Sequence, residues 1–123
     1  MHVLISDDCI VKQALIKEIL KELGHTYEVV NNGNEAIKKL EINYYDIVLM
    51  DTNMPEMDGI EATSIIRNIH SKVINHKIPI INISSQSKQH YLDYSLKVGM
   101  NDYLGESIST ESLKNSIAKV ILL

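Results

Sequence analysis

Three aspartates stand just beyond the ends of two apolar segments, where their like charges would lie close together. Asp7 and Asp8 follow residues 2–5, and Asp51 follows residues 47–50. Two carboxylates about 4 Å apart repel by roughly 4 kcal/mol at an effective dielectric constant near 20. Such a cluster holds a cation or has a raised pKa, and oxygen ligands with room for water suit Mg²⁺. A carboxylate beside Mg²⁺ can also attack phosphorus and become an acyl phosphate.

For a single aspartate, a solvated turn residue is the simpler interpretation. The three can meet only if the apolar segments before them are neighbouring strands. Short apolar runs alternate with helical patterns, and this predicts strands at 2–5, 27–30, 46–50, 78–83 and 102–104 and helices at 10–23, 34–42, 59–70, 89–98 and after Ser109. The third and fourth strands are apolar on both faces, which is typical of a parallel sheet covered by helices on both sides. Ligands of such sheets lie beyond the carboxyl ends of the strands.

The spacing of apolar residues also predicts which helix faces enter the core. In the first helix the predicted core residues recur every four positions, and they are Val11, Leu15, Ile19 and Leu23. In the last helix they are Leu113, Ile117 and Val120 or Ile121. We therefore expect five β–α units that pack into one α/β fold.

Composition narrows the class of protein. A chain of 123 residues suffices for one domain with a real core, so we expect a single domain over residues 1–123. The net charge of −4 argues against binding to nucleic acid or to an anionic membrane. No apolar run is long enough to cross a bilayer, and no basic region precedes the first apolar stretch as in a signal peptide. We expect a cytoplasmic location.

Four segments together resemble a response-regulator receiver domain of two-component signalling: VLISDD, DIVLMDTNMPEMDGIEAT, IPIINISS and GMNDYL. The resemblance covers essentially the whole chain. It implies a flavodoxin-like (βα)5 doubly wound parallel sheet with strand order 2-1-3-4-5. It also implies a sensor histidine kinase or phosphotransfer domain as partner, a downstream protein as a further one, and no enzymatic activity of the domain alone. The long connection at residues 70–77 resembles receivers of hybrid sensor histidine kinases.

The resemblance also implies roles for residues of the acidic site. Asp51 matches the phosphoacceptor, and Asp7 and Asp8 match the acidic pair. Asp8 would touch Mg²⁺ directly and Asp7 through water. Asn53 would offer its backbone carbonyl to the metal.

Two further residues match the switch of the family. Ser84 matches the hydroxyl residue that moves to the phosphoryl group, and Tyr103 matches the aromatic residue that then turns inward. This describes a two-state domain biased by one new anion. The surface that responds would be the helix at 89–98, the strand at 102–104 and the last helix.

The chain departs from the family at two adjacent positions. Glu106 and Ser107 stand where the family has a lysine and a proline. That lysine pairs with the acidic cluster and then with the phosphoryl oxygens, and we expect no nearby lysine to replace it, since Lys97 lies on a helix and Lys88 in a loop. A cis bond without proline costs about 2.5–4 kcal/mol, so we predict a trans bond between Glu106 and Ser107.

Several functions remain open at this point. The chain is a working receiver with weakened phosphorylation, or a degenerate receiver that serves as a phosphorylation-independent interaction module. A phosphatase of the haloacid-dehalogenase type needs an acid where this chain has Asn53. A mononucleotide binder needs a phosphate loop after the first strand, where Asp7 and Asp8 would repel phosphate.

Overall fold

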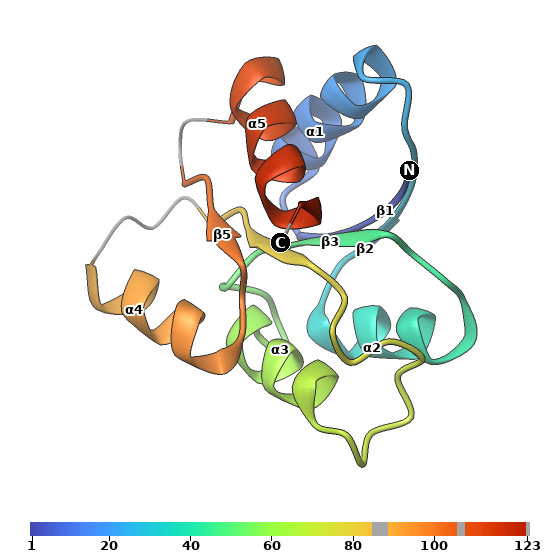
Figure 1. The fold of residues 1–123 in the computed structure, drawn as a ribbon, viewed down its shortest axis with the longest axis vertical. Coiled ribbons are helices and arrows are strands. Elements are labelled where there is room, and N and C mark those ends of the chain that lie inside the picture. Colours follow the sequence, from blue (N-terminus) through green and yellow to red (C-terminus); the bar gives the residue numbers. More distant parts are fainter. Residues whose placement is uncertain (85–88, 106–107, 123) are drawn as a thin grey trace.

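The computed structural model describes residues 1–84, 89–105 and 108–122, and it contains one parallel sheet of five strands. The strands are His2–Ser6 (β1), Thr26–Val30 (β2), Ile47–Met50 (β3), Ile80–Asn82 (β4) and Asp102–Tyr103 (β5). The helices are Ile10–Glu22 (α1), Gly33–Ile42 (α2), Gly59–Arg67 (α3), Gln89–Val98 (α4) and Thr110–Ile121 (α5). The strand order is β2-β1-β3-β4-β5, which confirms the predicted flavodoxin-like topology (Figure 1).

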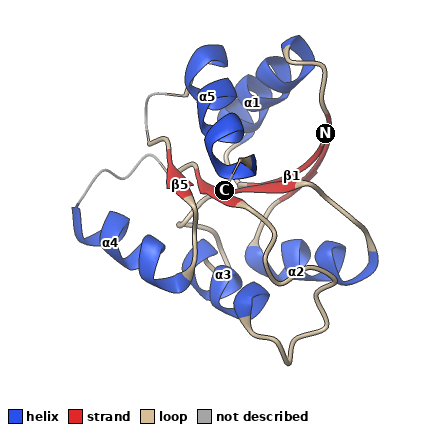
Figure 2. Ribbon diagram, in the orientation of Figure 1, coloured by secondary structure: helices blue, strands red, loops and turns tan. Residues whose placement is uncertain are grey.

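The sheet separates two helical layers. Helices α1 and α5 lie on one face, and α2, α3 and α4 lie on the other (Figure 2). Successive side chains of a strand point to opposite faces. Accordingly Ile5 packs with Ile16 of α1, whereas Leu4 packs with Ala36 of α2 and Ile66 of α3. The central strands are therefore buried on both sides, as their apolar sequences predicted.

The register of the sheet aligns the ends of the central strands. Ser6 of β1 pairs with Met50 of β3, and Met50 pairs with Asn82 of β4. The residues that follow these positions leave the sheet at one edge. This alignment brings the chain after β1, β3 and β4 to a common site.

Two predicted elements are shorter than expected. Helix α3 ends at Arg67 instead of residue 70, because Asn68 has an extended backbone and its side chain accepts a hydrogen bond from the His70 N–H at 2.9 Å. Strand β4 covers Ile80–Asn82 instead of 78–83, because Pro79 lacks an N–H and the Ser84 N–H bonds to the Asn82 side chain at 2.8 Å. The other boundaries differ by one residue at most.

The predicted core face of α1 was right at Ile19 and at Leu23, which packs against the core, and wrong at Val11 and Leu15. The buried residues of this helix are Gln13, Ile16, Ile19 and Leu20. Val11 is 79% exposed and Leu15 is 47% exposed. Residues that recur at every fourth position drift gradually around a helix. The spacing of three and four residues between Ile16, Ile19 and Leu20 keeps these side chains on one face. In α5 the predicted Leu113, Ile117 and Val120 are buried, and Ile121 is not.

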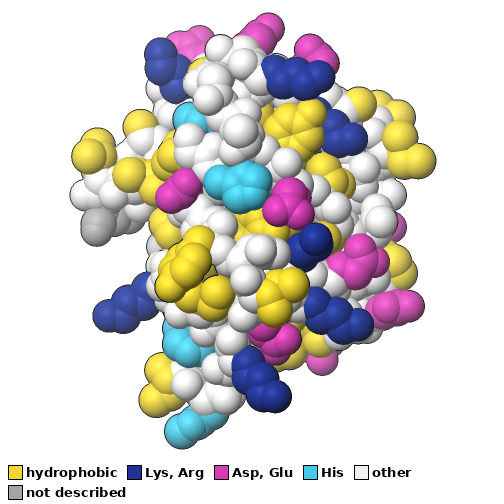
Figure 3. All heavy atoms as spheres, turned by 90° about the vertical axis from the view of Figure 1, so that its right-hand side faces the viewer, with side chains coloured by type: hydrophobic (Ala, Val, Ile, Leu, Met, Phe, Trp, Pro, Cys, Tyr) yellow, Lys and Arg dark blue, Asp and Glu magenta, His cyan; other side chains and the backbone are white. Residues whose placement is uncertain are grey.

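The surface carries mixed charges. On the side of the molecule that includes the β2 edge, basic and acidic side chains alternate without a patch of one sign (Figure 3). Within the described part of the chain, every helix is too short or too polar to cross a membrane.

Candidate functional site

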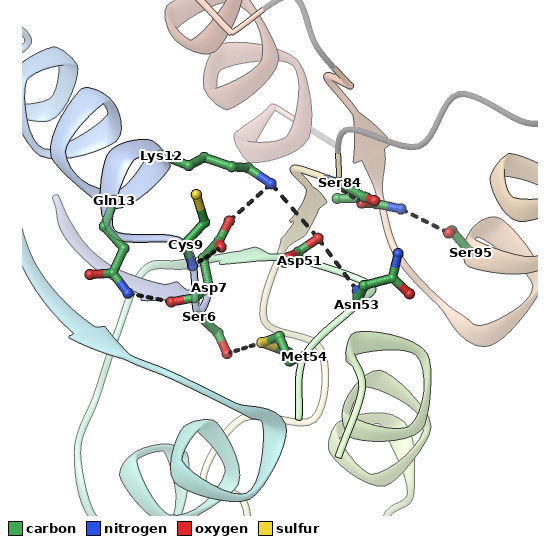
Figure 4. A network of polar contacts seen from close by, with 11 residues as sticks. Ser6, Asp7, Cys9, Lys12, Gln13, Asp51, Asn53, Met54, Ser84 and Ser95 are labelled. Atoms are coloured by element: carbon green, nitrogen blue, oxygen red, sulfur yellow. Dashed lines mark hydrogen bonds and ion pairs between the residues drawn. The ribbon is translucent and has the colours of Figure 1, made fainter. Parts of the chain in front are cut away.

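The three predicted aspartates converge at the carboxyl edge of the sheet. One carboxylate oxygen from each of Asp7, Asp8 and Asp51 lies within 4.8 Å of the others. The Asp7 side chain is fully buried, Asp51 is 7% exposed, and Asp8 is exposed. The site is thus a buried acidic pair with a third carboxylate that faces solvent, and Figure 4 shows Asp7 and Asp51 side by side.

Asp7 is held by contacts on both sides of β1. Its N–H donates to the Val30 carbonyl at 3.1 Å, and its Oδ1 accepts from the Cys9 N–H at 2.8 Å where α1 begins. The Gln13 amide donates to the Asp7 carbonyl oxygen. Asp7 Oδ2 is buried, and the ion pair it makes within the described residues is with the Lys12 ammonium at 2.9 Å. One oxygen of Asp7 therefore orients the chain, and the other points into the site.

Asp51 extends β3 by one residue. Its N–H donates to the Ser6 carbonyl at 2.9 Å, and its Oδ1 accepts a hydrogen bond from the Asn53 N–H at 3.4 Å. Burial raises the pKa of the Asp51 carboxyl, the positive charge of Lys12 lowers it, and the negative charge of Asp7 raises it further. The carboxylate is thus poorly solvated and benefits from any cation that reaches it.

A short loop connects Asp51 to α3 and places Asn53. Glu56 adopts a left-handed backbone with φ of 67°, which turns the loop back toward the sheet. Asp58 then caps α3, since its side chain accepts from the Glu61 N–H at 2.8 Å. Asn53 is exposed next to Asp51, where its backbone can take part in binding a ligand.

Lys12 belongs to the site, although the sequence analysis did not place it there. Its ammonium lies 2.9 Å from Asp7 Oδ2 and 3.7 Å from Asp51 Oδ1 (Figure 4). Lys88 and Lys97 were weighed from the sequence as neighbours of the acidic cluster, and Lys12, which the structure places there, was missed. The available signal was position: a lysine in the first turn of the helix that follows two acids lies beside the strand end.

Ser84 and Tyr103 lie on the side of the site formed by β4 and β5. Ser84 is 2% exposed, and its neighbour Asn82 donates a hydrogen bond to Ser95 Oγ of α4 at 2.9 Å. Tyr103 is half-buried, and its ring lies over Gly105, where a Cβ would come within 2.8 Å of the phenol oxygen. Glu106, Ser107 and Lys88 lie outside the described residues, and so does the predicted trans bond.

The donor set fits Mg²⁺. All the side-chain ligands are carboxylate oxygens, and one from each aspartate lies within 4.8 Å of the others, as a hard divalent ion requires. When ionised, the three carboxylates and the Lys12 ammonium leave an excess of two negative charges, which one divalent ion balances. Because Asp8 is exposed, an ion can reach the cluster from solvent.

Comparison with known proteins agrees with this geometry. The family model of the response regulator receiver domain matches residues 3–118. The chain belongs to the response regulator receiver domain family. The family resemblance of the motifs is thus confirmed, and the site is the acidic pocket of a receiver domain of two-component signalling.

Relatives of this receiver domain occur in larger proteins. It is 32% identical to the sensor histidine kinase GacS of Pseudomonas protegens over 96% of this chain and 13% of that protein. It is 35% identical to the transcription factor SKN7 of Saccharomyces cerevisiae over 98% of this chain and 18% of that protein. The receiver domain spans less than a fifth of the length of these curated relatives.

Solved structures show the same fold. The receiver domain of the sensor histidine kinase PA1611 from Pseudomonas aeruginosa PAO1 is 30% identical, with a TM-score of 0.87 over 99% of this chain and 98% of that one. That structure has a magnesium ion coordinated in its active site cleft. The chemotaxis response regulator CheY4 of Vibrio cholerae is 26% identical, with a TM-score of 0.84 over 97% of each chain.

Proposed function

We propose that residues 1–123 form one phosphoacceptor domain, which takes a phosphoryl group on Asp51 from a sensor histidine kinase or a phosphotransfer domain. The observation that carries this proposal is the convergence of Asp7, Asp8 and Asp51 within 4.8 Å at the sheet edge. A single nucleophilic carboxylate is thereby surrounded by groups that attract a divalent cation.

The chemistry divides among the residues of the site. An oxygen of the Asp51 carboxylate forms a bond to phosphorus while the phosphorus–nitrogen bond of the donor breaks, and the electron pair of that bond leaves with the donor nitrogen. Asp7, Asp8, Asp51 and the backbone carbonyl of Asn53 would hold Mg²⁺. The ion supplies positive charge that offsets the charge of the transferring group.

Exposed apolar side chains beside the site suit a protein donor. Ile10 and Val11 on the first turn of α1 are each 79% exposed, and Leu15 on the next turn is 47% exposed. Together these three residues form the α1 apolar surface. Apolar side chains exposed together commonly mark a protein-binding surface, and this surface adjoins the segment that carries Asp7 and Lys12.

A second region would respond to the phosphoryl group. Ser84 is buried at the end of β4, and Tyr103 borders a hollow of about 270 Å³ that Leu96 of α4 and Lys119 of α5 also line. In this proposal the Ser84 hydroxyl moves to the phosphoryl oxygens, Tyr103 turns inward, and a downstream protein binds α4, β5 and α5.

One observation favours a second candidate function. Glu106 replaces the lysine of the family, and its negative charge opposes a phosphoryl group. A receiver with this change can serve as an interaction module that does not depend on phosphorylation.

Phosphoryl transfer from acetyl phosphate distinguishes the two functions. The domain is incubated with Mg²⁺ and acetyl phosphate, and mass spectrometry detects the added phosphoryl group. We expect wild type and Asp93→Asn, which changes an exposed aspartate on α4, to gain one group, and Asp51→Asn to gain none. If wild type gains no mass and beryllofluoride leaves its NMR spectrum unchanged, the interaction module is the better account. With beryllofluoride, Ser84→Ala tests the switch, because it should lose the tyrosine fluorescence change of wild type.

A further inference from the structure

We propose that Lys12 of α1 supplies the positive charge that stabilises the phosphoryl group on Asp51, in place of the lysine that the family carries after its fifth strand. This inference rests on the proposed phosphoacceptor function and adds to it a residue that binds the transferring group. It also explains how a receiver with Glu106 can retain that function.

The contacts of Lys12 place its charge between the two buried carboxylates. Its ammonium is 2.9 Å from Asp7 Oδ2 and 3.7 Å from Asp51 Oδ1. The Lys12 side chain is 17% exposed, so the charge is partly shielded from water and keeps much of its strength. A phosphoryl group bonded to Asp51 would bring its oxygens next to this ammonium.

Apart from these contacts, the position of Lys12 in α1 is electrostatically unfavourable. Cys9 is the N-cap, so Lys12 lies in the first helical turn, where the helix dipole repels a cation. The first turn of α1 contains no acidic residue that would offset this repulsion. The stabilising partner is instead Asp7, which is fully buried. Contacts with the acidic site therefore stabilise Lys12 at this position, and the helix itself does not.

Other cations of the described residues lie elsewhere. Every ion pair to Asp7 or Asp51 within the described part of the chain comes from Lys12. Lys119 pairs with Asp102 at 3.4 Å on the α5 side of the sheet, and Lys97 is exposed on α4. Lys12 is therefore the described residue best placed to contact the phosphoryl oxygens.

The geometry gives Lys12 opposite effects on Mg²⁺ and on the phosphoryl group. Before transfer its ammonium lies within the acidic cluster and repels a second cation, so it weakens Mg²⁺ binding. After transfer begins, the same charge attracts the oxygens of the phosphoryl group. Removal of the charge should therefore strengthen metal binding while it slows phosphorylation, a combination that loss of folding or of site shape does not produce.

The test compares Lys12→Gln with Lys21→Gln, which removes an exposed lysine from the same helix. Rates of labelling by acetyl phosphate are measured at saturating Mg²⁺, and Mg²⁺ affinity is measured by tyrosine fluorescence. We expect Lys12→Gln to label roughly 10- to 100-fold more slowly than wild type, as expected when one charge that stabilises the transition state is lost. We expect its Mg²⁺ dissociation constant to fall about two- to tenfold, and Lys21→Gln to match wild type in both.

Two further variants keep the test decisive if Lys12→Gln is unstable. Lys12→Arg retains the charge and should keep most of the labelling rate. Glu106→Lys in the Lys12→Gln background restores a lysine at the family position and should recover the rate.

Three outcomes overturn the inference, and the first two are distinguishable from the third. If wild type labels and folded Lys12→Gln labels equally fast, or if Lys12→Gln loses Mg²⁺ binding together with labelling, Lys12 does not have this role and the phosphoacceptor function stands. If wild type itself is not labelled, the proposed function and the role of Lys12 fall together.

Discussion

The backbone of Gly59 lies directly against the backbone of Asp51: a Cβ on Gly59 would come within 1.9 Å of the Asp51 carbonyl oxygen. The Gly59 N–H donates to the Thr52 carbonyl at 3.1 Å, so the start of α3 is fixed to the end of β3. A side chain cannot fit without displacing the segment that carries Asp51. The glycine of the MDGIEAT motif is therefore a packing requirement of the site.

Gly59→Ala should destabilise the domain more than a glycine substitution in open space. We expect a loss of about 2–4 kcal/mol in the free energy of unfolding, because the steric overlap involves rigid backbone. Gly24→Ala is the control: Gly24 has φ of 79° and nothing within 4 Å of an added Cβ, so only backbone strain of about 1–2 kcal/mol applies. Urea unfolding of both variants measures the difference, and equal losses would contradict the close approach at Gly59.

Asp51→Asn should stabilise the metal-free domain at neutral pH. Burial raises the pKa of the Asp51 carboxyl above its ordinary value of 3.8, so the folded state binds a proton more tightly than the unfolded state does. Ionisation of Asp51 therefore costs stability as pH rises from the unfolded to the folded pKa, and the full cost applies above the folded pKa. We expect the variant to melt about 3–6 °C higher at pH 7 without Mg²⁺, for a gain near 1 kcal/mol.

The same comparison has two internal controls. The advantage of Asp51→Asn should shrink as pH falls toward 3.8, because wild type then becomes protonated. It should also shrink when Mg²⁺ is added, because in the proposed site the ion would bind the carboxylate that the variant lacks. An advantage that is independent of both pH and Mg²⁺ would mean that charge burial is not its cause.

Asp8→Asn should weaken Mg²⁺ binding with little effect on folding. Asp8 contributes an exposed carboxylate to the cluster, so its charge matters to the ion more than to the core. We expect the dissociation constant for Mg²⁺ to rise about tenfold or more, since the proposed site has few direct ligands and Asp8 would be one of them. Glu111→Gln, an exposed acid on α5, serves as the matched control in the fluorescence titration. Equal affinities in the two variants would exclude Asp8 as a ligand.

Val11→Asp should impair transfer from a protein donor while it spares labelling by acetyl phosphate. Val11 is 79% exposed on the α1 apolar surface, and a charge there must be desolvated when a partner covers it. We expect a loss of about 10-fold or more in the transfer rate from a phosphorylated histidine domain. This corresponds to a free-energy cost of about 1.4 kcal/mol or more at the interface. Ile42→Asp, on an exposed residue of α2, is the control. Parallel losses with both donors would mean that Val11 acts on the site itself.

The sequence by itself determined the fold and the acidic cluster. Apolar runs such as residues 47–50 are strands because every side chain in them is suited to burial, and the chain order of strands and helices leaves few sheet topologies. Because polar groups follow the strands at 2–6 and 47–50, the convergence of Asp7 and Asp51 could be predicted before their distance was known. These features depend on residue types and their order along the chain, so the sequence is enough to predict them.

The tertiary structure alone decided which face of α1 packs on the sheet and which lysine lies at the acidic site. The apolar residues of α1 permit two different faces, and packing on the sheet buries Ile16 and Leu20 while Val11 remains exposed. That rotation of α1 also turns Lys12 toward Asp7 and Asp51. Neither result follows from spacing alone, because the orientation of a helix is set by its contacts with distant segments, and the partner of a long flexible lysine depends on that orientation.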